Sequence, residues 1–428
     1  MMKVIVIGAG AAGLMAAGQA GAAGASVTAL EKNDIPGKKL LITGKGRCNI
    51  TNMETMSQFI GHLPGNGQFL YSCLARFDNN GLVRFFNELG LETKVERGGR
   101  VFPKSDRAGD VVNTLVHFCR SNGVEFEYSA PVDSIKTVDR HVVSVKLRDG
   151  REFDCDSAII ATGGASYPGT GSTGDGYEMA EKLGHTVIPV KPALVPLVTR
   201  EDWVMELQGL SLKNVEVAAY AGDKKLTSEF GEMLFTHFGV SGPIILTVSR
   251  GIAPYLENDG KVLLKINLKP ALSPEQLDAR IQRDFSTFAR KQYRNALGEL
   301  LPKSLIPVAV RLSGIPGDKP VHQVTREERQ GLATLLRALP LTVTGMRPLK
   351  EAIVTAGGVS VKEINPKTME SRLVKGLYLA GEVVDVDGYT GGYNLQAAFS
   401  MGYVAGINAA GAAAGGDLPP VGTCPSPY

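Results

Sequence analysis

The N-terminal residues combine apolar runs with a glycine-rich turn. Val4–Ile7 is an uninterrupted apolar run, which is typical of a parallel β-strand that is buried on both faces. Gly8–Gly13 then predicts a tight turn that leads into a small-residue helix, and Ser26–Leu30 predicts a second strand. No charged residue occurs from Val4 to Leu30, but this stretch contains six glycines. We therefore interpret it as strand, turn, helix and strand rather than as a membrane span or a signal sequence.

Two later segments also contain a strand that ends in glycine. Ser157–Ile160 runs into an Ala-Thr-Gly-Gly turn, and Leu377–Leu379 leads to Gly381-Glu382. A further predicted helix follows Gly391-Gly392. The glycines are concentrated in three regions, with 9, 7 and 12 of the 51 in residues 1–50, 160–185 and 350–416. We expect these three regions, far apart in the sequence, to converge on one large ligand.

The order strand, Gly-x-Gly-x-x-Gly, helix predicts a dinucleotide site. Gly8 permits the tight turn, Gly10 lets the backbone approach a pyrophosphate, and Gly13 allows close packing of helix on strand. Ala12 lies in the same turn, where the helix N-terminus offers free N–H groups to phosphates. Glu31 ends the second strand, where it can accept hydrogen bonds from ribose hydroxyls and would repel a 2′-phosphate.

The expected dinucleotide is FAD, and NAD is the alternative. The turn containing Gly163 and Gly164, together with the late strand–Gly–acid–helix unit, resembles the two-dinucleotide-binding-domain flavoproteins. In those proteins the late unit holds the ribityl chain, and its helix points at the flavin pyrimidine. A helix that starts near Gly392 would direct partial positive charge at N1/C2=O and stabilise the reduced flavin.

The middle of the chain has a different pattern from about residue 190. Apolar residues in 194–198, 215–220 and 262–268 predict short strands of a small barrel or sandwich. Ser273-Pro274-Glu275 is typical of a helix N-terminus. That helix carries an apolar stripe and, opposite it, a stripe of Arg280, Arg283, Arg290 and Arg294. Such a stripe is typical of a solvated face, and a contact with RNA or a cofactor phosphate is the alternative.

These patterns predict an α/β fold in which a Rossmann-like FAD-binding domain is split by an insertion. We expect residues 1–190 and 342–428 to form the FAD-binding domain. Residues 191–270 are expected to form an inserted β-barrel-like domain, which residues 335–345 could close. Residues 271–341 are expected to form a helical subdomain.

Composition and charge exclude several other classes of protein. The 428 residues are 43% hydrophobic and 21% charged, which is ordinary for a soluble globular protein. A net charge of +3 is too weak to indicate nucleic acid or a membrane surface. The cysteines are odd in number, form no Cys-x-x-Cys motif, and predict neither a disulfide nor a metal site but a reduced, cytoplasmic setting. They are Cys48, Cys73, Cys119, Cys155 and Cys424.

Several longer motifs resemble the BaiN/YhiN-type flavoproteins. They occupy residues 37–52, 99–105, 234–243, 355–359 and 381–396. The element Gly-Arg-Cys-Asn-x-Thr-Asn within residues 46–52 makes the resemblance specific, and the motifs together extend over nearly the whole chain. That group includes enzymes described as aminoacetone oxidases and as reductases of conjugated double bonds in oxo-bile acids.

The resemblance implies FAD in a flavin domain that is split by an insertion. It would place Glu31 on the adenosine ribose, the backbone of Val132 on the adenine, and Gly46–Asn49 along the flavin. The expected cofactor contacts in the glycine-rich regions include the residues of Gly46–Asn49 and several others. They are Lys32, Lys38, Lys39, Gly46, Arg47, Cys48, Asn49, Gly381, Glu382, Tyr393, Asn394 and Leu395.

Hydride transfer by a flavin requires a proton partner from the protein. His237 is the first acid/base or carbonyl-donor candidate, because imidazole titrates near neutrality, and a structural histidine is the alternative. Tyr389 and Tyr393 are candidate phenol donors, and Arg47 could stabilise developing negative charge. Cys48 is expected to pack near the cofactor rather than to act as a nucleophile.

The favoured function is NAD(P)H-linked reduction of an activated C=C bond or a related carbonyl in a small-molecule substrate. The first alternative is oxidation of an amine or aminoketone with formation of H₂O₂. The second alternative is that the chain is an FAD-containing RNA-modification or RNA-binding protein. No second nucleotide fingerprint occurs, so NAD(P)H would have to bind transiently. Neither a membrane nor a nucleic-acid partner is expected, and the oligomeric state is left open.

Overall fold

The computed structural model describes residues 1–257 and 260–411, which belong to two units. The first unit comprises Met1–Pro192 and the chain from Ile353 onwards, and the second comprises Ala193–Ala352. Each unit has its own hydrophobic core. Cys424, and the end of the segment predicted to reach residue 428, lie outside the described residues.

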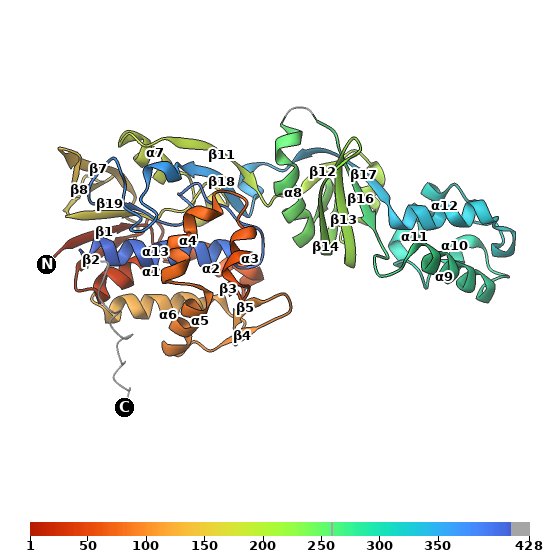
Figure 1. The fold of residues 1–428 in the computed structure, drawn as a ribbon, viewed down its shortest axis with the longest axis horizontal. Helices are drawn as coiled ribbons and strands as arrows, with labels where there is room; N and C mark the ends of the chain where they lie inside the picture. The colour runs from red at the N-terminus through yellow and green to blue at the C-terminus, as the bar shows by residue number, and fades with distance from the viewer. Residues whose placement is uncertain (258–259, 412–428) are drawn as a thin grey trace. The chain divides into compact units, whose positions relative to one another are not determined.

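Five parallel strands form the centre of the first unit, in the order β19-β10-β1-β2-β6 (Figure 1). They are β1 (Lys3–Ile7), β2 (Ser26–Leu30), β6 (Glu125–Glu127), β10 (Ser157–Ile160) and β19 (Leu377–Leu379). The side chains of Val4–Ile7 are buried because β1 is central in the sheet. Gly8, Gly163 and Gly381 follow the carboxyl ends of three adjacent strands, so the parallel sheet brings them to one edge.

Two glycine-containing helices pack closely against one another beside this sheet (Figure 1). They are α1 (Ala11–Ala22) and α13 (Tyr393–Ala409). A Cβ atom on Gly402 would lie 2.3 Å from the carbonyl oxygen of Ala12, and one on Gly406 would lie 2.3 Å from that of Ala16. Glycine is therefore required at both positions by the approach of two backbones.

Smaller elements surround the sheet and complete the first unit. Two three-stranded antiparallel sheets, in the orders β3-β5-β4 and β7-β8-β9, and a two-stranded sheet, β11-β18, flank it. Their strands are β3 (Thr51–Asn52), β4 (Thr93–Val95), β5 (Arg100–Pro103), β7 (Val132–Val138), β8 (His141–Leu147), β9 (Glu152–Asp154), β11 (Val187–Ala193) and β18 (Val354–Val359). The helices are α2 (Lys38–Ile42), α3 (Met56–Gly61), α4 (Tyr71–Arg76), α5 (Asn79–Glu88), α6 (Ala108–Ser121) and α7 (Asp175–Lys182).

The second unit contains a closed six-stranded barrel and a group of helices. The strand order is β12-β15-β14-β13-β16-β17. The strands are β12 (Leu197–Thr199), β13 (Ser211–Ala221), β14 (Lys224–Thr236), β15 (Gly239–Ser241), β16 (Val262–Asn267) and β17 (Leu339–Met346). The helices are α8 (Pro243–Leu256), α9 (Pro274–Thr287), α10 (Tyr293–Ala296), α11 (Ile306–Ser313) and α12 (Arg326–Arg337).

The end of the insertion differs from the predicted boundary. Thr342 was expected to begin the return to the flavin domain, but it lies inside β17, which pairs with both β12 and β16 and so closes the barrel. The first unit resumes at Ile353. The apolar alternation of Leu339, Leu341 and Val343, all buried in the barrel, explains why the chain stays in the insertion beyond 342.

The close packing of α1 on α13 makes a testable prediction about stability. Gly402→Ala should lower the free energy of unfolding by about 1–3 kcal/mol, because the new methyl group would force the two helices apart. The measurement is urea unfolding followed by circular dichroism. Gly109→Ala is the matched control, because a Cβ on Gly109 of α6 would have no neighbour within 4 Å. Equal stability of Gly402→Ala and the wild type would contradict this account of the packing.

Candidate functional site

The glycine loop between β1 and α1 has the geometry of a phosphate-binding turn. Gly8 has φ +98°, and a Cβ there would lie 2.6 Å from the carbonyl oxygen of Ala161 at the end of β10. Gly10 is the N-cap of α1, with no side-chain cap among the described residues, and a Cβ built on it would have no neighbour within 4 Å. The first N–H groups of α1 are thus available to an anion that approaches over Gly10. A Cβ on Gly13 would lie 1.8 Å from the carbonyl oxygen of Gly8, which explains the third glycine of the motif.

Hydrogen bonds to Glu31 connect this loop to the end of β2. Its buried carboxylate accepts hydrogen bonds from the backbone N–H of Ala9 (2.8 Å), the backbone N–H of Asn33 (2.9 Å) and the side-chain Nδ2 of Asn33 (2.7 Å). The N–H of Ala130 donates to the carbonyl oxygen of Glu31 (2.9 Å), which brings the start of β7, with Val132, beside the end of β2. The predicted adenosine contacts, Glu31 and Val132, therefore lie in neighbouring segments.

The predicted lysines occupy different surroundings. Lys32 forms an ion pair with Asp175 (2.7 Å) and donates to Thr173, so its ammonium group is held by the start of α7. Lys38 is half-buried at the start of α2. Lys39, next to it, forms an ion pair of 2.7 Å with Glu382 and donates to Ser166 (2.8 Å).

Glu382 joins all the glycine-rich regions of the first unit. Its carboxylate accepts from Lys39, from the hydroxyl of Ser166 (3.0 Å) and from the N–H of Thr355 (2.8 Å). Burial by itself would raise the pKa of Glu382, but the charge of Lys39 and these hydrogen bonds outweigh it and hold the pKa below its usual value. A Cβ on Gly164 would lie 2.5 Å from Thr355 Oγ1 and 2.9 Å from Glu382 Oε1, so only glycine fits beside this network.

The segment Gly46–Asn49 is shaped by a salt-bridge cluster. The Arg47 guanidinium pairs with Glu96 and Asp106, and it lies 4.1 Å from the centroid of the Phe102 ring. Hydrogen bonds to the two carboxylates raise the pKa of Arg47, and its charge is already balanced by them. Cys48 is buried with φ +59°, and burial raises the pKa of its thiol to about 12, in keeping with a packing role.

Two orphaned polar atoms lie in the same motif. Among the described residues, Asn49 Oδ1 and Thr51 Oγ1 are buried without a hydrogen-bond partner. A Cβ on Gly392, the N-cap of α13, would lie 2.5 Å from the carbonyl carbon of Thr51. The start of α13 and the Gly46–Asn49 segment thus share one small region, and its unsatisfied polar atoms fit contacts with a polar ligand such as a flavin.

The loop before α13 positions several predicted residues. The side chain of Asn394 accepts from the N–H of Gly388 (2.8 Å) and donates to the carbonyl oxygens of Gly388 and Tyr389 (2.8 and 3.2 Å), so it fixes the loop. Leu395 packs against the core, and a Cβ on Gly381 would lie 2.9 Å from the Cβ of Ala12 in the first turn of α1.

Glu54 and His62 also lie at the start of α13, and neither is expected there from the sequence. The Tyr393 hydroxyl donates to Glu54 Oε2 (3.0 Å), and the His62 ring stacks on Tyr393 with centroids 4.6 Å apart. His62 Nδ1 lies 3.2 Å from Glu54 Oε2 and 3.0 Å from the carbonyl oxygen of Gln58. Burial and the bond to Glu54 raise the pKa of Tyr393, so its phenol stays protonated. No motif marks Glu54 or His62, because the contact depends on α3 folding against a helix more than 300 residues later.

The candidate catalytic residues are distributed over both units. Arg47 and Tyr389 belong to the first unit, and the N–H of Tyr389 donates to the carbonyl oxygen of His62 (2.9 Å). His237 belongs to the second unit, where it is exposed between β14 and β15 with its ring 4.9 Å from that of Phe238. Residues 1–257 and 260–411 contain no group of three potential metal ligands. Within the same two ranges, we find no helix with the length and apolar character of a membrane span.

Comparison with known proteins gives matches over nearly the full chain. A 3-dehydro-bile acid delta(4,6)-reductase from Clostridium scindens is 35% identical over 412 residues, which are 96% of this chain and 99% of that protein. A ribosomal RNA dihydrouridine synthase from Haemophilus influenzae is 34% identical over 408 residues, 94% of this chain and 97% of that protein. The corresponding synthase from Escherichia coli is 34% identical over 93% of this chain and 96% of that protein.

Solved structures support the fold. The 3-ketosteroid delta1-dehydrogenase of Sterolibacterium denitrificans has a TM-score of 0.53 at 14% identity, with 96% of this chain and 100% of that chain covered.

The family description "HI0933-like protein Rossmann domain" matches residues 2–408. Together with the full-length relatives, this match confirms the predicted resemblance, the Rossmann-type fold and the general class, an FAD-dependent oxidoreductase. The chain belongs to the HI0933-like Rossmann-domain family.

Proposed function

We propose that this protein is an FAD-dependent reductase of a C=C bond conjugated to a carbonyl group, with NADH or NADPH as the electron donor. The observation that best supports this proposal is the chemistry that its full-length relatives have in common. The bile-acid reductase is named for 4,6 double bonds in a 3-oxo compound, and a dihydrouridine synthase saturates the uracil ring beside its carbonyl. These unlike substrates undergo the same reaction, reduction of a C=C bond next to a carbonyl group. We therefore propose this reaction for the protein, with an oxo-alicyclic compound and an RNA uracil as the two candidate types of substrate.

The residues that would hold FAD come from the three glycine-rich regions. Gly8–Gly13 and the start of α1 would hold the pyrophosphate, and Glu31 with Val132 would hold the adenosine. Asn49, Thr51 and the start of α13 would lie along the flavin, since their polar atoms are left for a ligand. When bound, FAD supplies a group that can give or accept a hydride.

The protein must supply the proton that completes such a reduction. His62 is suited to this task because its Nδ1 donates to the carbonyl oxygen of Gln58, which leaves Nε2 to exchange a proton. Glu54 and Tyr393 hold the His62 ring in place. The side chain of His62 is 39% exposed, so the imidazole can regain a proton from solvent. His237 and Tyr389 stay as predicted alternatives.

The choice between reductase and oxidase can be tested directly. Anaerobic mixing with NADPH or NADH should bleach the oxidised-flavin absorbance, and a 4,6-diene-3-oxo bile acid or an unmodified ribosomal RNA fragment should restore it without O₂. The substrate that restores it identifies the substrate type. Failure of both pyridine nucleotides to bleach the flavin, with H₂O₂ formed from an aminoketone in air, would support the oxidase and contradict the proposal.

The place of Glu31 can be tested through FAD retention. Glu31→Ala should weaken FAD binding by roughly tenfold or more, since it removes a ribose acceptor and leaves the N–H of Ala9 unpaired. Loss of FAD during repeated ultrafiltration measures this. Glu92→Ala is the control, because the Glu92 side chain is 71% exposed and pairs only with Lys104 among the described residues. Equal retention by wild type and Glu31→Ala would exclude the ribose assignment.

The role of His62 can be separated from its packing. His62→Phe keeps an aromatic ring on Tyr393 but removes the imidazole nitrogens, so turnover should fall about 100-fold or more while FAD is retained. The exposed His141 provides the control variant His141→Phe. Steady-state rates as a function of pH, with flavin content from absorbance, give the readout. Wild-type turnover in His62→Phe would return the proton-donor role to His237 or Tyr389.

A further inference from the structure

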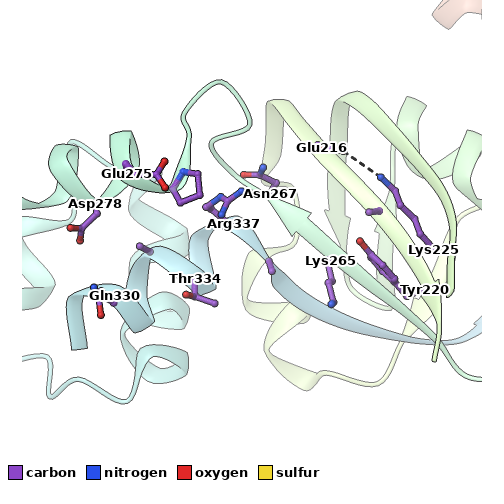
Figure 2. A pocket seen from close by; sticks show the side chains of 14 residues that line it. Glu216, Tyr220, Lys225, Lys265, Asn267, Glu275, Asp278, Gln330, Thr334 and Arg337 are labelled. Atoms are coloured by element: carbon purple, nitrogen blue, oxygen red, sulfur yellow. Dashed lines mark ion pairs between the residues drawn. The ribbon is translucent and has the colours of Figure 1, made fainter. Parts of the chain in front are cut away.

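A groove lies within the second unit, between the outer face of the barrel and two helices (Figure 2). It has a volume of about 670 Å³, within the range of small-molecule sites. Strands β13, β14 and β16 form one side, and α9 and α12 form the other. None of the cofactor contacts expected from the sequence lines it.

The carboxylates of this groove are already occupied by donors. Glu216 accepts from the hydroxyl of Ser228 (2.7 Å) and lies 4.0 Å from Lys225. Asp278 forms an ion pair with Arg329 (2.7 Å).

Glu275, the third acid, accepts from the hydroxyl of Ser273 (2.7 Å). That hydrogen bond, with a smaller contribution from the charge of Arg337, lowers the pKa of Glu275. Glu275 therefore stays ionised with Arg337 as a nearby cation, whereas the charges of Glu216 and Asp278 are balanced by Lys225 and Arg329.

Two basic side chains of the groove, Lys265 and Arg337, form no ion pair with any of the described residues. Lys265 lies over the Tyr220 ring, 4.6 Å from its centroid. The Oδ1 of Asn267 accepts from the N–H of Lys269 (3.1 Å), which leaves its Nδ2 to donate elsewhere. Figure 2 shows Arg337 and Asn267 close together, with Lys265 farther along the same groove.

Such a set of unpaired donors suits a ligand that is rich in acceptors and carries negative charge. Phosphate oxygens accept hydrogen bonds from arginine and lysine side chains, so Arg337 and Lys265 can each contact a phosphate group at its own place along the groove. The amides of Asn267 and Gln330, with the hydroxyl of Thr334, can reach neutral acceptors beside it. A ribose hydroxyl can donate to Glu275 Oε1, because the Ser273 hydroxyl occupies only Oε2, and a bare inorganic anion would not use this acceptor.

We propose that this groove binds the phosphate-bearing part of a ribonucleotide, with Lys265 and Arg337 as the phosphate contacts. The ligand is a free nucleotide or one unit of an RNA strand, since both present the same phosphate and ribose. This site differs from the predicted arginine stripe. Only Arg280 and Arg283 of that stripe lie on α9, which ends at Thr287 before Arg290 and Arg294, and Arg280 is paired with Asp284 (2.8 Å).

Binding to the FAD-loaded full-length protein tests the proposal without reference to turnover. The probes are UMP, NADPH and a fluorescein-labelled oligouridylate, titrated against wild type, Lys265→Gln and Arg337→Gln. Each variant should weaken binding of at least one probe about tenfold, as expected for loss of a charged hydrogen bond, and should reduce the salt dependence of oligouridylate binding. Lys303→Gln, at an exposed lysine that does not line the groove, is the matched control.

The pattern of results identifies the ligand or overturns the site. Loss of UMP or NADPH binding in both groove variants supports a free nucleotide, and loss of oligouridylate binding alone supports an RNA strand. If no probe binds the wild type, or if every probe binds Lys265→Gln and Arg337→Gln as it binds Lys303→Gln, the groove is not a phosphate site. A stronger effect of Arg283→Gln than of either groove variant would assign binding to the arginine face of α9 instead and overturn the proposal.

Discussion

The half-buried carboxylate of Glu382 is the constraint on which the first unit depends. An ionised group removed from water is costly unless partners surround it, and here Lys39, Ser166 and Thr355 supply them. These partners come from α2, from the turn after β10 and from β18. Satisfying one carboxylate therefore fixes three distant parts of the chain around the carboxyl edge of the sheet, where we propose that FAD binds.

The arrangement also explains how a long insertion is tolerated. The second unit has its own barrel core, which β17 closes, and the chain leaves and re-enters the first unit at β11 and β18, two strands that pair with one another. Because the exit and the return are adjacent in one small sheet, the network around Glu382 forms without structural demands on the residues between them.

Much of this architecture could be predicted from local pattern. The apolar run Val4–Ile7, the spacing of Gly8, Gly10 and Gly13, and Glu31 all reflect short-range requirements of strand, turn and helix, and the sequence shows these directly. The predicted end of the insertion at Thr342 differs from the structure, because a barrel strand that pairs with β12 has the same local sequence pattern as any other apolar strand. His62 and Glu54 were missed for a related reason, since their meeting with Tyr393 is a tertiary contact with no sequence spacing to mark it.

The central claim is that a conjugated C=C bond receives a hydride from the cofactor and a proton from the protein. Turnover in D₂O with unlabelled NADPH, followed by mass spectrometry and NMR of the product, tests this most directly. The account predicts a saturated product with one solvent-derived deuterium on the carbon next to the carbonyl and an unlabelled hydrogen on the other carbon. A product that keeps its C=C bond, or one with no solvent deuterium at that position, would contradict it.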